Sequence, residues 1–158
     1  MRILVTYDSH NEQVPKTAKM VAELLRRGNN EVDLVDLAQK EIDILVPYEK
    51  IVIGGALWFG KLDEWMRKYL IKNQTELLIK PTFLFIHAYV GTALFQSQLA
   101  STLPIEILSH ALTFNLGMNV DTDELNPVEK IKWKVMHQKV ETPIDDERVR
   151  EFVSFVLR

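Results

Sequence analysis

The sequence predicts an α/β fold of three layers, in which helices cover both faces of a doubly wound, parallel sheet of about five strands. Two observations carry this prediction. Short runs of β-branched and aromatic residues alternate along the chain with segments in which apolar residues recur at helical spacing. The chain has 158 residues, the size of one domain, and contains neither repeats nor a Gly/Ser linker. We therefore expect a single domain over residues 1–158.

The first strand and the first helix are the most clearly marked elements. Residues 3–7 (ILVTY) form an apolar, β-branched run that is typical of a buried strand. A helix is expected over about residues 14–27, because Pro15 suits a first helical turn and Gly28 can end the last one. The apolar residues of this segment share one helix face: Val14, Ala18, Val21, Ala22 and Leu25.

The later elements continue the alternation. A buried strand over residues 50–54 is expected to break at Gly54 and Gly55, where the chain should turn sharply. Asn126 and Glu129 have the spacing of a capping box, which predicts a helix from that point to about residue 138. The other expected elements are an edge strand (31–35), an irregular segment (42–48), a helix (62–70), a central strand (82–88), a short helix (92–101), a strand within 105–114 and an amphipathic C-terminal helix (145–157).

Charge and composition exclude several classes of function. Lys and Arg total 19 and Asp and Glu total 22, and the resulting net charge of −3 argues against a nucleic-acid-binding protein. The chain has no cysteine, which excludes disulfides, thiolate metal sites and cysteine nucleophiles, and we expect no metal site. Neither a membrane-spanning run nor a signal-peptide pattern is found, so we expect a cytoplasmic protein.

Three loops are expected at the carboxyl edge of the sheet, where ligands bind in open parallel sheets. The loop over residues 8–14 is polar and opens a helix, so it either holds a phosphate or is a solvated, capped helix start. The loop over residues 55–61 places Trp58 and Phe59 between glycines, either as an aromatic wall for a flat ring or as core residues. The loop over residues 87–91 holds His87 and Tyr89, and His87 either faces the same ligand or is an ordinary residue at the end of a strand.

Residues 3–18 and the stretch 51–60 (IVIGGALWFG) resemble the flavodoxin-like family, and residues 141–155 match it more weakly. The resemblance is greatest to the group that includes the menaquinone-dependent protoporphyrinogen oxidases. It implies a flavodoxin-like fold and non-covalent FMN binding, with the first loop around the phosphate and the other two loops flanking the flavin ring. The cofactor-binding residues that it implies are Ser9, His10, Asn11, Gln13, Val14, Ala56, Leu57, Trp58, Phe59, Gly60, His87, Ala88, Tyr89 and Gly91.

The sequence departs from the family pattern at two positions of the first loop. Glu12 stands where the family has glycine, and Val14 stands where it has a hydroxyl residue. At ~5 Å and an effective dielectric constant of ~20, an inward-pointing Glu12 costs ~3 kcal/mol for each unit charge of a phosphate. The main prediction is an FMN-dependent oxidoreductase acting on a small redox molecule, of the quinone or porphyrinogen class by resemblance. The alternatives are a flavodoxin-fold binding module that has lost FMN and an electron-shuttle flavodoxin, although net −3 argues against a shuttle.

No catalytic residue is assigned beyond Tyr89 and His87, which are candidate hydrogen-bond donors near the ring or the substrate. A redox protein partner and a homodimer are possible assemblies. The helix after Asn126 offers a surface to a partner or to an anionic membrane, although we favour a solvated face. This surface consists of Lys130, Lys132, Trp133, Lys134, Met136, His137 and Lys139. Trp65, Met66 and Tyr69 lie at helical spacing and are expected to be core residues.

Overall fold

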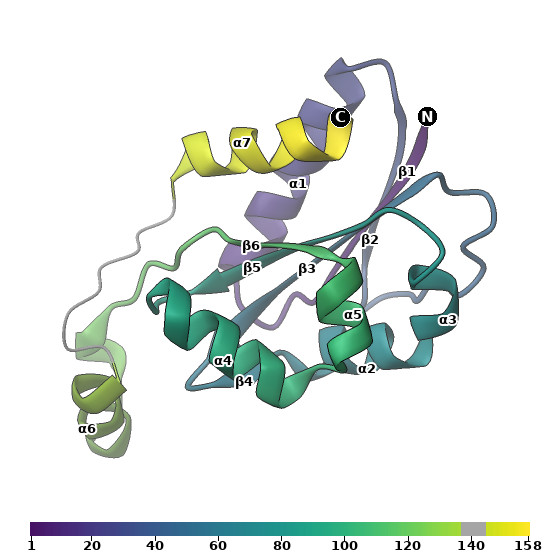
Figure 1. The fold of residues 1–158 in the computed structure, drawn as a ribbon. Helices are drawn as coiled ribbons and strands as arrows, with labels where there is room; N and C mark the ends of the chain where they lie inside the picture. The colour runs from purple at the N-terminus through teal and green to yellow at the C-terminus, as the bar shows by residue number, and fades with distance from the viewer. Residues whose placement is uncertain (137–144) are drawn as a thin grey trace.

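The computed structural model describes residues 1–136 and 145–158 and contains one sheet with helices on both faces (Figure 1). Five parallel strands have the order β2-β1-β3-β5-β6, and the short β4 pairs antiparallel with the end of β3. The order reverses between β1 and β3, and ligands bind beside such a switch point in doubly wound sheets. The strands are β1 (Arg2–Tyr7), β2 (Glu31–Asp36), β3 (Lys50–Trp58), β4 (Lys61–Leu62), β5 (Thr82–Ala88) and β6 (Leu112–Asn115).

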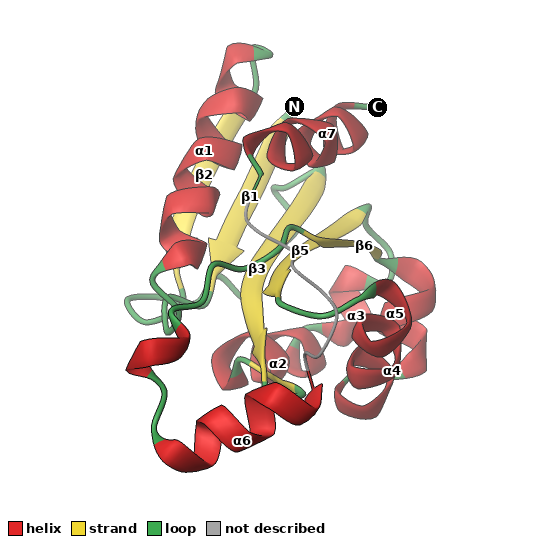
Figure 2. Cartoon of the chain, turned by 90° about the vertical axis from the view of Figure 1, so that its left-hand side faces the viewer, coloured by secondary structure: helices red, strands yellow, loops and turns green. Residues whose placement is uncertain are grey.

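The helices divide between the two faces of the sheet. Figure 1 shows α1 (Gln13–Arg27) and α7 (Asp146–Leu157) on one face. The other face carries α2 (Glu64–Lys72), α3 (Gln74–Leu77), α4 (Thr92–Thr102) and α5 (Ile105–His110). The 3-10 helix η1 (Thr122–Glu124) precedes α6 (Pro127–Met136), which lies beyond the carboxyl ends of the strands (Figure 2).

Two apolar cores lie on opposite faces of the sheet, since successive strand residues point to opposite sides. Ile3, Val5 and Val52 face α1 and α7, while Leu4 and Ile53 face α2 and α4. The C-terminal helix closes the first core with four side chains that are at most 5% exposed: Val149, Phe152, Val153 and Val156.

Most of the expected elements are confirmed with small changes at their ends. The first strand, the first helix, the central strand over Thr82–Ala88 and the C-terminal helix are all present. The strand over Glu31–Asp36 lies at the edge of the sheet, as its alternating pattern predicts. Met66 and Tyr69 are core residues, but Trp65 is 41% exposed, so its assignment to the core was wrong.

The predicted break at Gly54 and Gly55 is wrong. β3 runs straight through both glycines and ends only at Trp58. The glycines serve close packing, because a Cβ on Gly54 would lie 2.0 Å from the Phe85 ring and a Cβ on Gly55 would lie 2.4 Å from the sulfur of Met66. The extra residues carry the strand out to the carboxyl edge of the sheet, where the turn forms at Phe59 and Gly60.

The segment over residues 105–114 contains a helix that the sequence analysis missed. Only its end, from Leu112, belongs to the expected strand. Pro104 fixes the backbone before α5, and Glu106 lies in its first turn, where a carboxylate suits the helix dipole.

The predicted capping box at the start of α6 is confirmed. The Asn126 side chain accepts from the Glu129 N–H at 2.8 Å, and the Glu129 carboxylate accepts from the Asn126 N–H at 3.2 Å. The expected end of this helix near residue 138, together with His137, Lys139 and the start of the 141–155 match, lies outside the described residues.

A Gly54→Ala substitution should lower the free energy of unfolding by about 1–3 kcal/mol, because the added methyl group overpacks the core against Phe85. Urea unfolding monitored by circular dichroism measures the change. Gly28→Ala is the matched control, since its Cβ would lie no closer than 3.1 Å to any neighbour, with the Asn30 side chain at 3.1 Å and the Leu25 carbonyl oxygen at 3.3 Å. Equal stability of the two variants would contradict the packing role of Gly54.

Candidate functional site

A cleft of about 1010 Å³ opens beyond the carboxyl ends of β1 and β3. Its walls are residues 10–13 at the start of α1, Trp58 at the end of β3, and residues 118–121 after β6. A smaller pocket of about 250 Å³ adjoins it and shares His10, Asn11 and Trp58. Four carboxylates and one lysine line the larger cleft: Glu12, Asp121, Glu124, Glu129 and Lys16.

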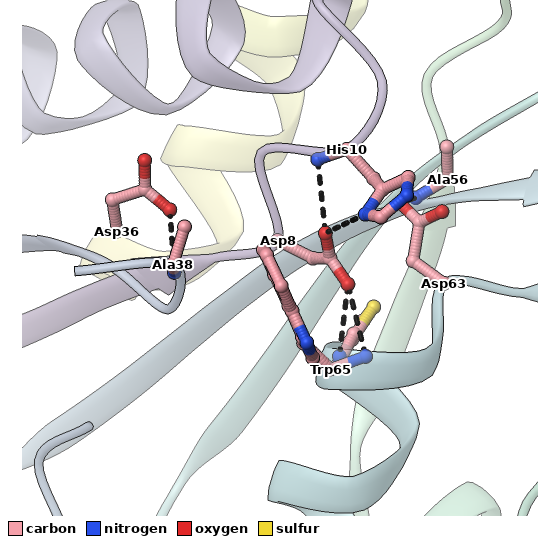
Figure 3. A network of polar contacts seen from close by, with 8 residues as sticks. Asp8, His10, Asp36, Ala38, Ala56, Asp63 and Trp65 are labelled. Carbon is pink, nitrogen blue, oxygen red and sulfur yellow. Dashed lines mark hydrogen bonds and ion pairs between the residues drawn. The ribbon is translucent and has the colours of Figure 1, made fainter. Parts of the chain in front are cut away.

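The fully buried carboxylate of Asp8 holds the floor of this region together (Figure 3). It accepts hydrogen bonds from the backbone N–H of His10 at 2.9 Å, of Trp65 at 3.1 Å and of Met66 at 3.3 Å. The last two groups belong to the first turn of α2, so Asp8 satisfies the start of a helix that is distant in sequence. The ring of His10 then packs edge-on against Trp65.

Asp63 fixes the strand that carries the aromatic residues. Its carboxylate accepts from the Ala56 N–H at 2.8 Å, and its own N–H donates to the Ala56 carbonyl at 2.9 Å. Burial raises the pKa of Asp63 to about 6, and the nearby charge of Asp8 adds to this shift. The smaller pocket therefore contains a carboxyl group that titrates close to neutral pH.

Several backbone N–H groups at the start of α1 are already hydrogen-bonded within the loop that precedes the helix. The Gln13 N–H donates to the Asn11 side chain, the Val14 N–H donates to the Asn11 carbonyl, and Pro15 has no N–H. The Gln13 side chain is bound to the backbone of Asn119, donating at 2.7 Å and accepting at 2.9 Å. Gln13 thus lines the cleft, as expected for a site residue. Its side-chain amide, however, is bound to the segment after β6, which forms the opposite wall of the cleft.

His87 does not line the cleft, which favours the alternative that it is an ordinary residue at the end of a strand. Its side chain is fully buried, with Nδ1 2.6 Å from the Gly117 carbonyl and Nε2 2.8 Å from the Thr17 hydroxyl. Burial lowers the pKa of His87, which favours the neutral ring. Like Gln13, His87 connects α1 to the segment after β6, so the two braces together fix that wall.

An aromatic cluster stands at the carboxyl ends of β3 and β5. Leu57 pairs with Ala88 across the two strands, so Trp58 and Tyr89 follow on neighbouring strands. The Trp133 ring of α6 lies against both, at centroid distances of 5.9 Å to Trp58 and 4.7 Å to Tyr89. Phe59 completes the cluster, 4.9 Å from Trp58 and 6.2 Å from Trp133.

The Phe59–Gly60 turn fixes the orientation of the aromatic wall that Trp58 and Phe59 form. Both residues have positive φ, 47° and 79°, and they form the two-residue connection between Trp58 and Lys61. Positive φ at both positions is the pattern of the type I′ hairpin turn, whose twist matches that of the flanking strands. Trp58 and Phe59 are half-buried, as suits a wall that is open on one side.

Several predicted site residues contribute no open side chain. Val14, Leu57 and Ala88 are at most 4% exposed and pack in the two cores. Any contact of these residues with a ligand would therefore come from their backbone, and their assignment to the cofactor site stays a prediction. Of the other predicted residues, the cleft and its smaller neighbour bring together His10, Asn11, Gln13, Ala56 and Trp58, and Tyr89 joins through the aromatic cluster.

The sequence analysis did not name Asp63 as a residue of this region. It placed Asp8 only within the polar 8–14 loop and Trp133 only on the surface of the later helix, without a role at the site. The role of Asp8 could have been predicted, because a carboxylate directly after a buried strand needs hydrogen-bond partners. Within the described residues, no group of three or more His, Cys, Asp or Glu is placed to hold a metal ion. The same residues contain no helix long and apolar enough to cross a membrane.

Comparison with known proteins agrees with the observed fold. The family model of the flavodoxin domain matches residues 4–146. Flavodoxin 1 from Bacillus cereus shares 14% identity, with a TM-score of 0.57 over 98% of this chain and 94% of that one. A short-chain flavodoxin associated with a non-canonical PDU bacterial microcompartment shares 15% identity, with a TM-score of 0.58 over 98% and 95%.

A flavodoxin variant from Fusobacterium nucleatum, solved with flavin mononucleotide bound, shares 10% identity, with a TM-score of 0.52 over 72% of this chain and 67% of that one. At such low identities the structural likeness shows the fold. A search of curated proteins finds no match to this chain. The narrower resemblance to menaquinone-dependent protoporphyrinogen oxidases stays a prediction.

Asp63→Asn should stabilise the protein near pH 7 and leave it almost unchanged near pH 4. The folded-state pKa of Asp63, about 6, lies above the ordinary value of 3.8, so its ionisation disfavours the folded state as the pH rises through this window. The gain near pH 7 should be about 1–2 kcal/mol, because partial exposure screens part of the shift. Urea unfolding of both proteins between pH 4 and pH 8 measures this difference. A constant difference across the range would contradict the assignment.

Proposed function

The chain belongs to the flavodoxin domain family, and from this premise we propose that it binds FMN in the cleft and acts as an electron-transfer flavoprotein. The observation that carries the proposal is that an aromatic surface and a polar loop lie beside each other at one edge of the sheet. Aromatic side chains stand at the ends of β3 and β5, and a polar loop opens α1 at the end of β1. A flat apolar ring with a charged tail needs these two surroundings side by side.

The ring end of the cleft fits a flavin. Trp58 and Tyr89 follow paired residues of neighbouring strands, so their side chains flank one region at the sheet edge. Ring stacking is worth about 0.5–1.5 kcal/mol for each aromatic pair beyond the area buried. The Phe59–Gly60 turn holds the Trp58 side of this region in place.

The tail end offers donors for a phosphate. Asn11 and Glu12 line the cleft, and their backbone N–H groups have no hydrogen-bond partner in the described part of the chain. Lys16, one turn into α1, adds a positive charge, and the dipole of α1 acts in the same direction. The hydroxyl of Ser9 lies at the start of the same loop.

The carboxylates of the cleft oppose a dianionic phosphate. Glu12 lies in the phosphate loop itself, and Asp121, Glu124 and Glu129 line the same cleft. We infer that FMN binds more weakly here than the stacking and hydrogen bonds alone would allow. The same charges are the observation that favours the second candidate function, a flavodoxin-fold binding module without FMN.

When bound, FMN supplies the electron chemistry, and the protein positions and shields it. The resemblance implies an acceptor of the quinone or porphyrinogen class, and this assignment stays a prediction. Screening both classes with the FMN-loaded, pre-reduced protein tests it: reoxidation by one class alone would identify the acceptor.

Titration with FMN, followed by flavin fluorescence, tests the proposed function. We expect strong quenching with a micromolar dissociation constant, because the ring would stack on Trp58. Trp58→Ala should reduce the quenching and weaken binding by about tenfold, which corresponds to about 1.4 kcal/mol. The absence of binding at millimolar FMN by the folded protein would reject the electron-transfer proposal and leave the binding module.

Glu12→Gln should tighten FMN binding by about threefold to tenfold, because it removes a negative charge near the phosphate while solvent screens part of the repulsion. Glu23→Gln is the matched control: it makes the same charge change on an exposed face of α1 and leaves the cleft lining unaltered. Calorimetric titration of the three proteins measures the change. Equal affinities would show that Glu12 points away from the ligand.

A further inference from the structure

Trp133 takes the position at the sheet edge where an aromatic ligand would be expected. Its ring is tilted by only 37° from that of Trp58 and by 38° from that of Tyr89. These two side chains come from β3 and from the loop after β5, whereas Trp133 comes from α6, more than forty residues later in the chain. One indole thus contacts both of the side chains that the proposed function assigns to the flavin ring.

Helix α6 lies against the body of the protein through a narrow face. Within residues 127–135, only Glu129 and Trp133, one turn apart, are partly buried. Val128, Ile131 and Val135 are between 62% and 71% exposed. Helix α6 lies beyond the carboxyl ends of the strands (Figure 2), and the ring contacts of Trp133 are its main attachment to the sheet edge.

The helix start has its own stabilisation. The Asn126–Glu129 capping box satisfies the first N–H groups of α6 within the helix itself. Movement of α6 away from the sheet edge would therefore break the ring contacts of Trp133 without unpairing the start of the helix.

We propose that Trp133 is a built-in competitor of the flavin ring, and that ring binding between Trp58 and Tyr89 displaces Trp133 together with α6. This inference rests on the proposed function, and it adds control of the same site by α6. The apparent affinity for FMN is then reduced by the fraction of molecules in which Trp133 is withdrawn. The position of α6 would in turn report whether the ring is bound.

The first test compares FMN affinities of the wild-type protein, Trp133→Ala and Val135→Ala. Val135 is 71% exposed on the same helix and makes no ring contact, so its variant is the matched control. We expect Trp133→Ala to bind FMN at least about tenfold more tightly, because a competitor present in nine-tenths of the molecules lowers affinity tenfold. Val135→Ala should bind like the wild type, and circular dichroism checks that all three are folded.

The second test follows α6 directly. The chain has no cysteine, so Ile131→Cys on α6 and Ile79→Cys on the body accept a unique pair of spin labels, and both positions are more than 65% exposed. We expect the distance distribution between the labels to shift when FMN is added. Riboflavin, which has the same ring without the phosphate, should produce the same shift.

The outcomes separate this inference from the proposed function. Tighter binding by Trp133→Ala together with a label shift supports both. Equal or weaker binding by Trp133→Ala, or an unchanged label distance with FMN bound, overturns the competitor role and leaves the FMN proposal standing. The absence of FMN binding by the wild type and by Trp133→Ala overturns both.

Discussion

The buried carboxylate of Asp8 is the contact on which the rest of the cleft depends. It joins the end of β1, the loop after it and the first turn of α2 through three backbone N–H groups. A buried carboxylate without such partners would cost several kcal/mol, so these three segments hold one another in place. Asp63, directly before α2, then fixes Ala56, and Trp58 follows two residues later. The aromatic wall therefore takes its position from two carboxylates, Asp8 through α2 and Asp63 through Ala56.

The other walls of the cleft are held in different ways. Two side-chain braces, from Gln13 and His87, fix the segment after β6 to its neighbours. Helix α6 instead rests on ring contacts, which are weaker than the hydrogen bonds that the buried carboxylate of Asp8 accepts in the floor of the cleft. The floor and the wall after β6 are held by hydrogen bonds, whereas α6 is held by ring stacking. In the proposed mechanism α6 can therefore move away from the ring site while the floor and the other wall stay in place.

The fold could be predicted from the sequence because its signals are local. The apolar stripe from Val14 to Leu25 and the capping box at Asn126 each lie within one element and need no tertiary contact. The glycines of β3 misled the prediction because their role is close packing on Phe85 and Met66, partners that only the folded sheet supplies. The site was predicted only in part, because some of its features follow from local sequence and topology and others depend on long-range contacts. Loops at strand ends follow from topology, whereas the burial of His87 and the insertion of Trp133 are long-range contacts without a local signal.

A crystal structure of the protein grown with about 1 mM FMN would test the central claim most directly. The account predicts the flavin ring against Trp58 and Tyr89, the phosphate at the loop that opens α1, and Trp133 withdrawn from the aromatic cluster. A well-ordered structure with Trp133 in its present position and no FMN in the cleft would contradict it.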